Sequence, residues 1–148
     1  MSSLVPILFV SDEQIAAIGA GLVDLSLPKA RWTHAAHFAA ALWLMSCRRD
    51  LDAERDMPGL IRAYNEATGV ANTDTEGYHE TITQASLRAA RSFLRQDSQR
   101  SLFATCNALM QSPLGTSNWL LTYWTRARLF SVDARRRWVE PDLRPLPF

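Results

Sequence analysis

The chain has 148 residues, with 16 basic and 15 acidic side chains and a formal net charge of +1. This length is typical of one compact domain, so we expect a single domain over residues 1–148. The balanced charge gives no bulk attraction to nucleic acid or to an anionic membrane, and neither is expected as a partner. The sequence also contains no run of the ~20 apolar residues that a membrane-spanning helix needs.

The apolar run over residues 4–10 does not resemble a targeting signal, because no basic segment precedes it and Pro6 interrupts it. The two cysteines, Cys47 and Cys106, lie in apolar stretches and lack the CxxC spacing of redox and metal motifs. Such thiols are usually reduced and packed rather than joined in a disulfide. We therefore expect a cytoplasmic protein.

Apolar residues recur at helical spacing along the chain, which predicts an all-α fold, a bundle of six or seven helices. The first helix should begin at the capping box of residues 11–14, with Ser11 as its cap, and the second after the N-cap Thr33. A third is expected over residues 60–68. Its start is open, because Pro58 either opens this helix or kinks a longer one that begins near Leu51.

The second half of the chain predicts four more helical segments. They are expected over residues 78–94, over residues 98–111, from a cap at Thr116 or Ser117 to about Ala127, and over residues 131–138. Three prolines follow the last segment and predict an extended tail. No segment shows the alternating pattern of a strand.

All three histidines lie at expected helix starts. His34 and His37 are three residues apart and share one helix face, and His79 lies in the first turn of another helix. Neutral imidazole is a common metal ligand and titrates near neutrality. If the three rings converge, they match the layout of a catalytic site for zinc or a similar divalent metal, with a fourth position open to water.

Two acidic residues are candidates for catalysis at this site. Glu80 follows His79 directly and cannot share its face, because neighbours on a helix differ by about 100°. It is expected to orient a ligand or to favour the helix start through the helix dipole. Asp74 precedes the same helix and is a candidate general base at the mouth of the pocket.

Polar side chains near the histidines in sequence complete the predicted pocket as candidate ligand contacts. They are Tyr64, Asn65, Asn72, Thr73 and Tyr78. A bound divalent metal would act as a Lewis acid or activate water, as in a hydrolase or transferase. The alternative is a metal-free module that binds a small molecule or a protein, in which the histidines only fix helix ends. The HxxH pattern alone is too common to decide between them.

Several segments resemble a family of small bacterial helical proteins of uncharacterised function. The resemblance covers most of the chain and lies in Trp32-Thr33-His34-Ala35-Ala36-His37, Tyr64-Asn65-Glu66, Asn72-Thr73, Gly77-Tyr78-His79-Glu80-Thr81 and the stretch 138–143. It implies a shared fold and a shared site, but no activity. The chain is more loosely similar to metal-binding four-helix proteins of the DinB type, which also gather three histidines in a bundle with a different spacing.

Overall fold

The computed structural model describes residues 8–148, so the first part of the apolar run 4–10 lies outside the described residues. Over residues 8–148 the fold has no strand, and the prediction of an all-α bundle is confirmed. Seven α-helices occur in this part: α1 (Asp12–Val23), α2 (His34–Cys47), α3 (Ala53–Ala67), α4 (Glu80–Gln96), α5 (Leu102–Gln111), α6 (Arg126–Leu129) and α7 (Val132–Arg136). Three 3-10 helices join them: η1 (Lys29–Arg31), η2 (Pro113–Gly115) and η3 (Trp119–Thr122). None of the helices in the described chain has the length and apolar character needed to cross a bilayer.

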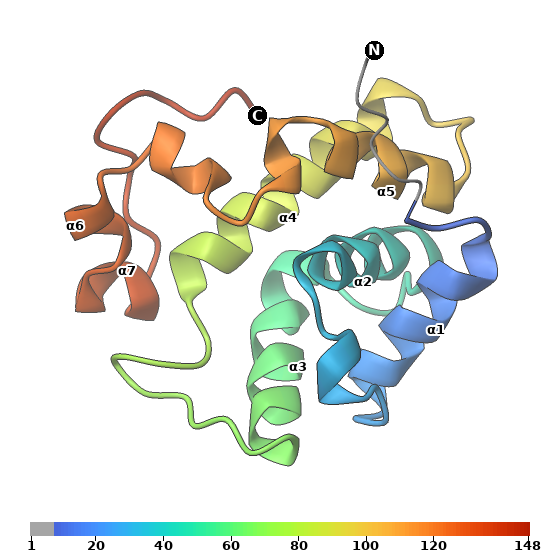
Figure 1. Ribbon diagram of the computed structural model, residues 1–148, viewed down its shortest axis with the longest axis horizontal. Helices are drawn as coiled ribbons and strands as arrows, with labels where there is room; N and C mark the ends of the chain where they lie inside the picture. Colours follow the sequence, from blue (N-terminus) through green and yellow to red (C-terminus); the bar gives the residue numbers. More distant parts are fainter. Residues whose placement is uncertain (1–7) are drawn as a thin grey trace, which may run out of the picture.

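The central element is α2, which contacts α1, α3, α4 and α5 (Figure 1). From Phe38 to Met45 its sequence is apolar on every side, and most residues of this stretch are buried. A helix that is apolar all round must be surrounded by other elements. The buried apolar side chains of the described residues form one connected core around it. In Figure 1, α6 and α7 lie near the start of α4, at the opposite side of the molecule from α1.

The first two helices begin as predicted. Ser11 caps α1 by accepting a hydrogen bond from the Gln14 amide at 3.4 Å, and the Gln14 side chain accepts one from the Val10 amide at 2.8 Å. Thr33 caps α2 by accepting a hydrogen bond from the Ala36 amide at 3.2 Å. These side chains pair amides that a helix start otherwise leaves free.

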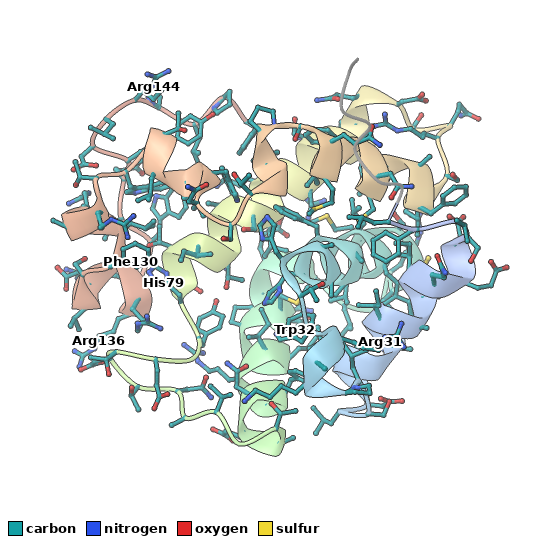
Figure 2. The ribbon with its side chains drawn as sticks, viewed as in Figure 1. Arg31, Trp32, His79, Phe130, Arg136 and Arg144 are labelled. Atoms are coloured by element: carbon teal, nitrogen blue, oxygen red, sulfur yellow. The ribbon has the colours of Figure 1, made fainter. Side chains whose placement is uncertain are left out.

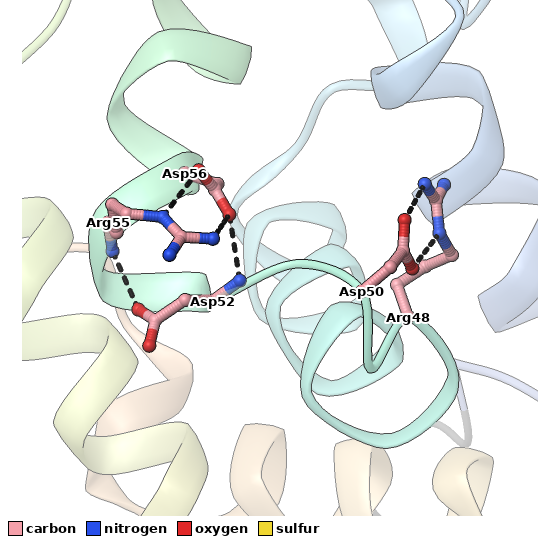
Figure 3. A network of polar contacts seen from close by, with 5 residues as sticks. All are labelled: Arg48, Asp50, Asp52, Arg55 and Asp56. Atoms are coloured by element: carbon pink, nitrogen blue, oxygen red, sulfur yellow. Dashed lines mark hydrogen bonds and ion pairs between the residues drawn. The ribbon is translucent and has the colours of Figure 1, made fainter.

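Helix α3 is the longer of the two alternatives, one helix with Pro58 inside it. Its start is fixed by a local charge network, shown in Figure 3. The Asp52 carboxylate accepts from the Arg55 amide at 2.9 Å, and the Asp56 carboxylate accepts from the Asp52 amide at 2.8 Å. The Arg55 guanidinium donates to Asp56 and, with the Asp52 backbone, lowers the pKa of Asp56 to about 2. A charged Asp56 therefore holds the first turn over the whole physiological range.

Pro58 is accommodated by a side chain of the neighbouring helix. Proline has no N–H, so the carbonyl of Glu54, four residues earlier, loses its usual partner within the helix. The Gln84 side-chain amide on α4 donates to that carbonyl at 3.0 Å. The bond thus pairs a carbonyl that the proline frees and ties α3 to α4.

We expect Gln84→Ala to lower the free energy of unfolding by about 1–2 kcal/mol, because it leaves the Glu54 carbonyl unpaired. In a Pro58→Ala background the new N–H of residue 58 can donate to that carbonyl, so Gln84→Ala should lower the free energy of unfolding by less. A double-mutant cycle by urea denaturation measures the difference. An equal cost in both backgrounds would show that Gln84 does not compensate for the proline.

The predicted helix from about 117 to 127 is wrong. The chain forms η3 and then a separate short helix, α6, because Thr125 starts a new helix by capping the Arg128 amide at 3.3 Å. The Asp142 carboxylate in the tail accepts from the Thr125 amide at 2.7 Å. A long-range partner thus takes the donor that a continuous helix would have used.

Candidate functional site

A cavity of about 300 Å³ lies between the first half of α2, the middle of α3, the first half of α4 and the segment around η3. Most of its wall is apolar, with side chains such as Phe38, Ile61 and Leu87. Besides the indoles of Trp32 and Trp119, the polar side chains in the wall are His34, His37, Thr83, Ser86 and Ser117. No Asp, Glu, Lys or Arg is among the described residues that line it. We call this space the histidine cavity.

Backbone carbonyls fix both imidazoles of the histidine cavity. His37 Nδ1 lies 2.7 Å from the Thr33 carbonyl oxygen, and His34 Nε2 lies 2.8 Å from the Leu114 carbonyl oxygen. Because a carbonyl only accepts, each of these nitrogens carries the hydrogen. The other nitrogen of a neutral ring, Nε2 of His37 and Nδ1 of His34, then keeps a lone pair. Trp32 packs on the His37 ring with the centroids 3.8 Å apart.

His37 is held in its neutral form. Burial among protein atoms lowers its pKa, the bond to Thr33 partly opposes this, and the nearby His34 lowers the pKa further. Although protein atoms surround the ring, His37 remains an exposed residue, and it lines the histidine cavity, so part of its surface can face a bound molecule. At neutral pH His37 therefore offers the cavity an uncharged hydrogen-bond acceptor.

Trp119 borders the same cavity and has an unpaired donor. Its Nε1 is the one buried side-chain polar atom of residues 8–148 that has no hydrogen-bond partner. The residue is 4 % exposed, and it also lines a second groove. A buried N–H without a partner costs about 1–3 kcal/mol, so an acceptor that reached it would be favoured.

His79 has a different environment from the other two histidines. It is buried and caps α4, with Nδ1 accepting from the Ile82 amide at 3.1 Å and Nε2 donating to the Leu129 carbonyl at 2.7 Å. Both ring nitrogens are thus used. Burial and the nearby Arg135 lower its pKa, against the opposing effect of the Leu129 bond.

The structure does not bring the three histidines together. His79 is absent from the residues that line the histidine cavity, and Figure 2 shows it at the start of α4 near Phe130, away from Trp32. Within residues 8–148 no group of three or more His, Cys, Asp or Glu side chains is arranged to hold a metal. The three-histidine ligand set predicted from the sequence is therefore not assembled, and metal binding itself stays a prediction.

The lowered histidine pKa values predict acid sensitivity. In the unfolded chain His37 and His79 have a pKa of about 6.5 and take up protons there, while in the folded protein these two take up protons only at lower pH. The free energy of unfolding should be constant above about pH 6.5 and should fall as the pH decreases from there towards 5. Urea denaturation at each pH measures this. His79→Asn should reduce the slope, and a flat profile in the parent protein would contradict the lowered pKa values of His37 and His79.

Three of the predicted polar residues hold the structure together and do not line the histidine cavity. The Tyr64 hydroxyl is fully buried and donates to the Leu27 carbonyl at 2.7 Å. The Asn65 side-chain amide donates to Asn72 Oδ1 at 3.0 Å. The Asn72 side chain in turn forms hydrogen bonds to backbone groups on both sides of the connection between α3 and α4. These residues therefore order the connection rather than the cavity.

Asn72 and three of the remaining predicted residues lie together at a second place. Asn72, Thr73, Asp74 and Tyr78 line a smaller cleft of about 150 Å³ beside α7. Asp74 is ion-paired with Arg136, which lowers its pKa, so it stays charged well below neutral pH. The Tyr78 hydroxyl donates to the Glu80 carboxylate; burial first, and then this contact, raise the pKa of Tyr78. The structure thus places both candidate acids, Asp74 and Glu80, away from the lining of the histidine cavity.

Sequence reasoning missed the role of Trp119 and Met57 in the cavity wall. The helical spacing of Trp119 is typical of a core residue, and a residue in a cavity wall has the same spacing. The two cysteines differ in burial. Cys106 is buried, which raises its pKa to about 12. Cys47 is exposed at the end of α2, so the prediction that both thiols are packed is wrong for this residue.

Comparisons with protein-family models, with curated proteins and with solved structures gave no match.

Proposed function

We propose that the protein binds a small, uncharged and largely apolar molecule in the histidine cavity. The observation that carries this proposal is a preformed space of about 300 Å³ with an apolar wall and two imidazoles held by backbone carbonyls. Cavities of about 300–1,000 Å³ with few, well-placed polar groups are typical of small-molecule sites. The volume favours a molecule at the small end of that range.

The polar groups of the wall indicate what the molecule must offer. His37 Nε2 accepts a hydrogen bond when the ring is neutral, so the ligand should carry a hydroxyl or an N–H. The hydroxyls of Thr83, Ser86 and Ser117 can each donate or accept. A charged ligand would lose its hydration without a charged partner in the wall, which disfavours it strongly.

Trp119 adds an acceptor to this description. Its Nε1 has no accessible surface, so a ligand can reach it only after a small rotation of the indole. Such a rotation would pair the unpaired donor and would contribute to binding. We therefore expect ligands with both a donor and an acceptor, such as small phenols, alcohols with an ether or carbonyl group, and amides.

A second candidate function follows from the histidine bonding pattern. A metal-ligating histidine usually donates its other ring N–H to a carbonyl or carboxylate, and His34 and His37 each donate to a carbonyl in this way. The two imidazoles would supply two ligands to a divalent metal such as zinc. Water and a substrate would have to fill the remaining coordination positions. This candidate retains the proposal of a metal-dependent hydrolase or transferase.

The unpaired thiols of Cys47 and Cys106 fit the expected cytoplasmic location, because disulfides are rare in the reducing cytosol.

The first test is a ligand screen by NMR. Neutral phenols, alcohols and amides are added to methyl-labelled protein, each beside its hydrocarbon analogue. Saturable shifts of the methyl signals of Met57, Ile61 and Ile82, stronger for the compound with the donor, support the proposal. Shifts confined to other methyl groups, or no binder in the set, count against it.

The second candidate is tested by titrating zinc into the parent protein and into His37→Gln. It requires that zinc binds the parent saturably and that His37→Gln no longer binds it.

A further inference from the structure

The cleft beside α7 carries an excess of positive charge. Its wall contains the guanidinium groups of Arg62, Arg135 and Arg136 and the single carboxylate of Asp74. Arg136 pairs with Asp74 through two bonds of 2.8 and 2.6 Å. Among the described residues, Arg62 and Arg135 have no carboxylate within 4.0 Å. Two positive charges thus remain uncompensated in the wall of one small cleft.

Both uncompensated arginines are anchored on Tyr78. The Arg62 guanidinium carbon lies 4.4 Å from the centre of the Tyr78 ring, in a cation–π contact. Arg135 Nη1 donates to the Gly77 and Tyr78 carbonyls at 3.0 and 3.3 Å. The stacking contact leaves the N–H groups at the edge of the Arg62 guanidinium free, and Arg135 keeps its Nη2 and Nε hydrogens. The shared anchor therefore holds two sets of charged donors near one point.

The connection between α3 and α4 is ordered around these donors. Asn72 Oδ1 accepts from the Tyr78 amide at 3.0 Å, and Asn72 Nδ2 donates to the Arg62 carbonyl at 3.1 Å. One asparagine thus joins α3 to the residue on which both arginines rest. Donors that are positioned before a ligand arrives lose less freedom on binding.

The neighbouring acids do not cancel this charge within the cleft. Asp133 pairs with Arg137 at 3.1 Å, and Glu80 accepts from the Tyr78 hydroxyl. Neither carboxylate is among the residues that line the cleft. The local excess therefore belongs to Arg62 and Arg135.

We propose that this cleft binds one phosphate group, either free phosphate or the phosphate of a small monoester. A phosphate carries about −1.5 to −2 charges at neutral pH, which matches the two uncompensated arginines. Its oxygens accept paired hydrogen bonds from the guanidinium fork. The volume of about 150 Å³ holds the phosphate group, and the rest of an ester would extend into solvent. This site uses Asn72, Asp74 and Tyr78, which the histidine cavity does not, and it is independent of the proposed function.

The test is a titration with sodium phosphate and, separately, with glycerol phosphate, at constant ionic strength. The side-chain Nε–H signals of Arg62 and Arg135 and the Tyr78 amide are followed by ¹H–¹⁵N NMR. Saturable shifts of these signals are expected. Tighter binding of the ester would identify a phosphate monoester as the ligand, and equal or weaker binding of the ester would identify free phosphate. Both results support the site.

Matched variants separate a site from general charge attraction. Arg62→Gln should weaken phosphate binding ~10-fold or more, as expected for the loss of a charge-assisted pair. Arg62→Lys keeps the charge but loses the fork, and should fall between Arg62→Gln and the parent. Arg144→Gln makes the same charge change far from Arg136 and the cleft (Figure 2) and should leave the affinity unchanged.

Each variant must first show the same amide spectrum as the parent outside the cleft, which establishes that it is folded. If Arg62→Gln does not fold, Arg62→Lys takes its place in the comparison. Shifts that rise linearly without saturation, or equal affinities for Arg62→Gln and Arg144→Gln, would overturn the proposal. They would show only ionic attraction to the surface.

Discussion

Replacing His79 with alanine is expected to lower the free energy of unfolding by about 2–4 kcal/mol. The change removes the cap of α4, which pairs the Ile82 amide, and it leaves the Leu129 carbonyl without its donor. Both groups belong to a buried region, since His79 is only 7 % exposed. Urea denaturation at pH 7 measures the loss.

His79→Asn is the matched control. Asparagine is one of the best N-cap residues, so it should restore the bond to the Ile82 amide while the bond to Leu129 stays lost. We expect it to recover about 1 kcal/mol of the loss. A stability equal to the parent in His79→Ala would contradict a structural role and would return His79 to the list of candidate ligands.

Gly77→Ala should be similarly destabilising, by about 2–5 kcal/mol. Gly77 has a φ of +79°, in the left-handed region where a side chain is strained. A Cβ there would also collide with the Ala71 carbonyl oxygen and with Asn72. The loop that carries Tyr78 would have to shift, so the variant should also lose phosphate binding in the cleft beside α7.

Gly59→Ala provides the opposite expectation. Gly59 lies inside α3, and a Cβ there would meet nothing within 4 Å. Alanine favours a helix interior over glycine by about 1 kcal/mol, so this variant should be more stable than the parent. Thermal melting of the two variants compares them directly. Equal effects of the two replacements would show that the loop conformation at Gly77 is not required.

The all-α fold was predictable because each long apolar stripe has helical spacing, and α2 shows how strong this signal is. The capping residues Ser11 and Thr33 also acted as predicted, because a cap depends only on residues three positions away. Prediction from local sequence failed where a residue distant in the sequence determines where a helix continues or ends. The continuity of α3 depends on Gln84, and the break before α6 involves Asp142, and neither partner is near in sequence.

The candidate site was predictable only in part for the same reason. His34 and His37 lie on one helix, so their common place in a cavity wall follows from their spacing. The position of His79 relative to them depends on how α4 packs, which no local pattern encodes. Its role as a cap was also hidden, because histidine is a less common N-cap than serine, threonine or aspartate. The predicted polar residues Asn72, Thr73 and Tyr78 lie together, but around arginines from α3 and α7 and not around the histidines.

The most direct measurement of the central claim is ligand affinity after the histidine cavity has been filled. Ser86→Leu places an apolar side chain in the cavity wall, whereas Ser92→Leu makes the same change on the same helix at a residue that does not line the cavity. Both serines are partly buried, which makes the pair a matched test. For the best compound of the NMR screen, titrated into each variant, we predict a loss of at least ~10-fold in Ser86→Leu, the size of effect that about 1.4 kcal/mol produces, and no change in Ser92→Leu. Equal affinities of the two variants would contradict binding in the histidine cavity.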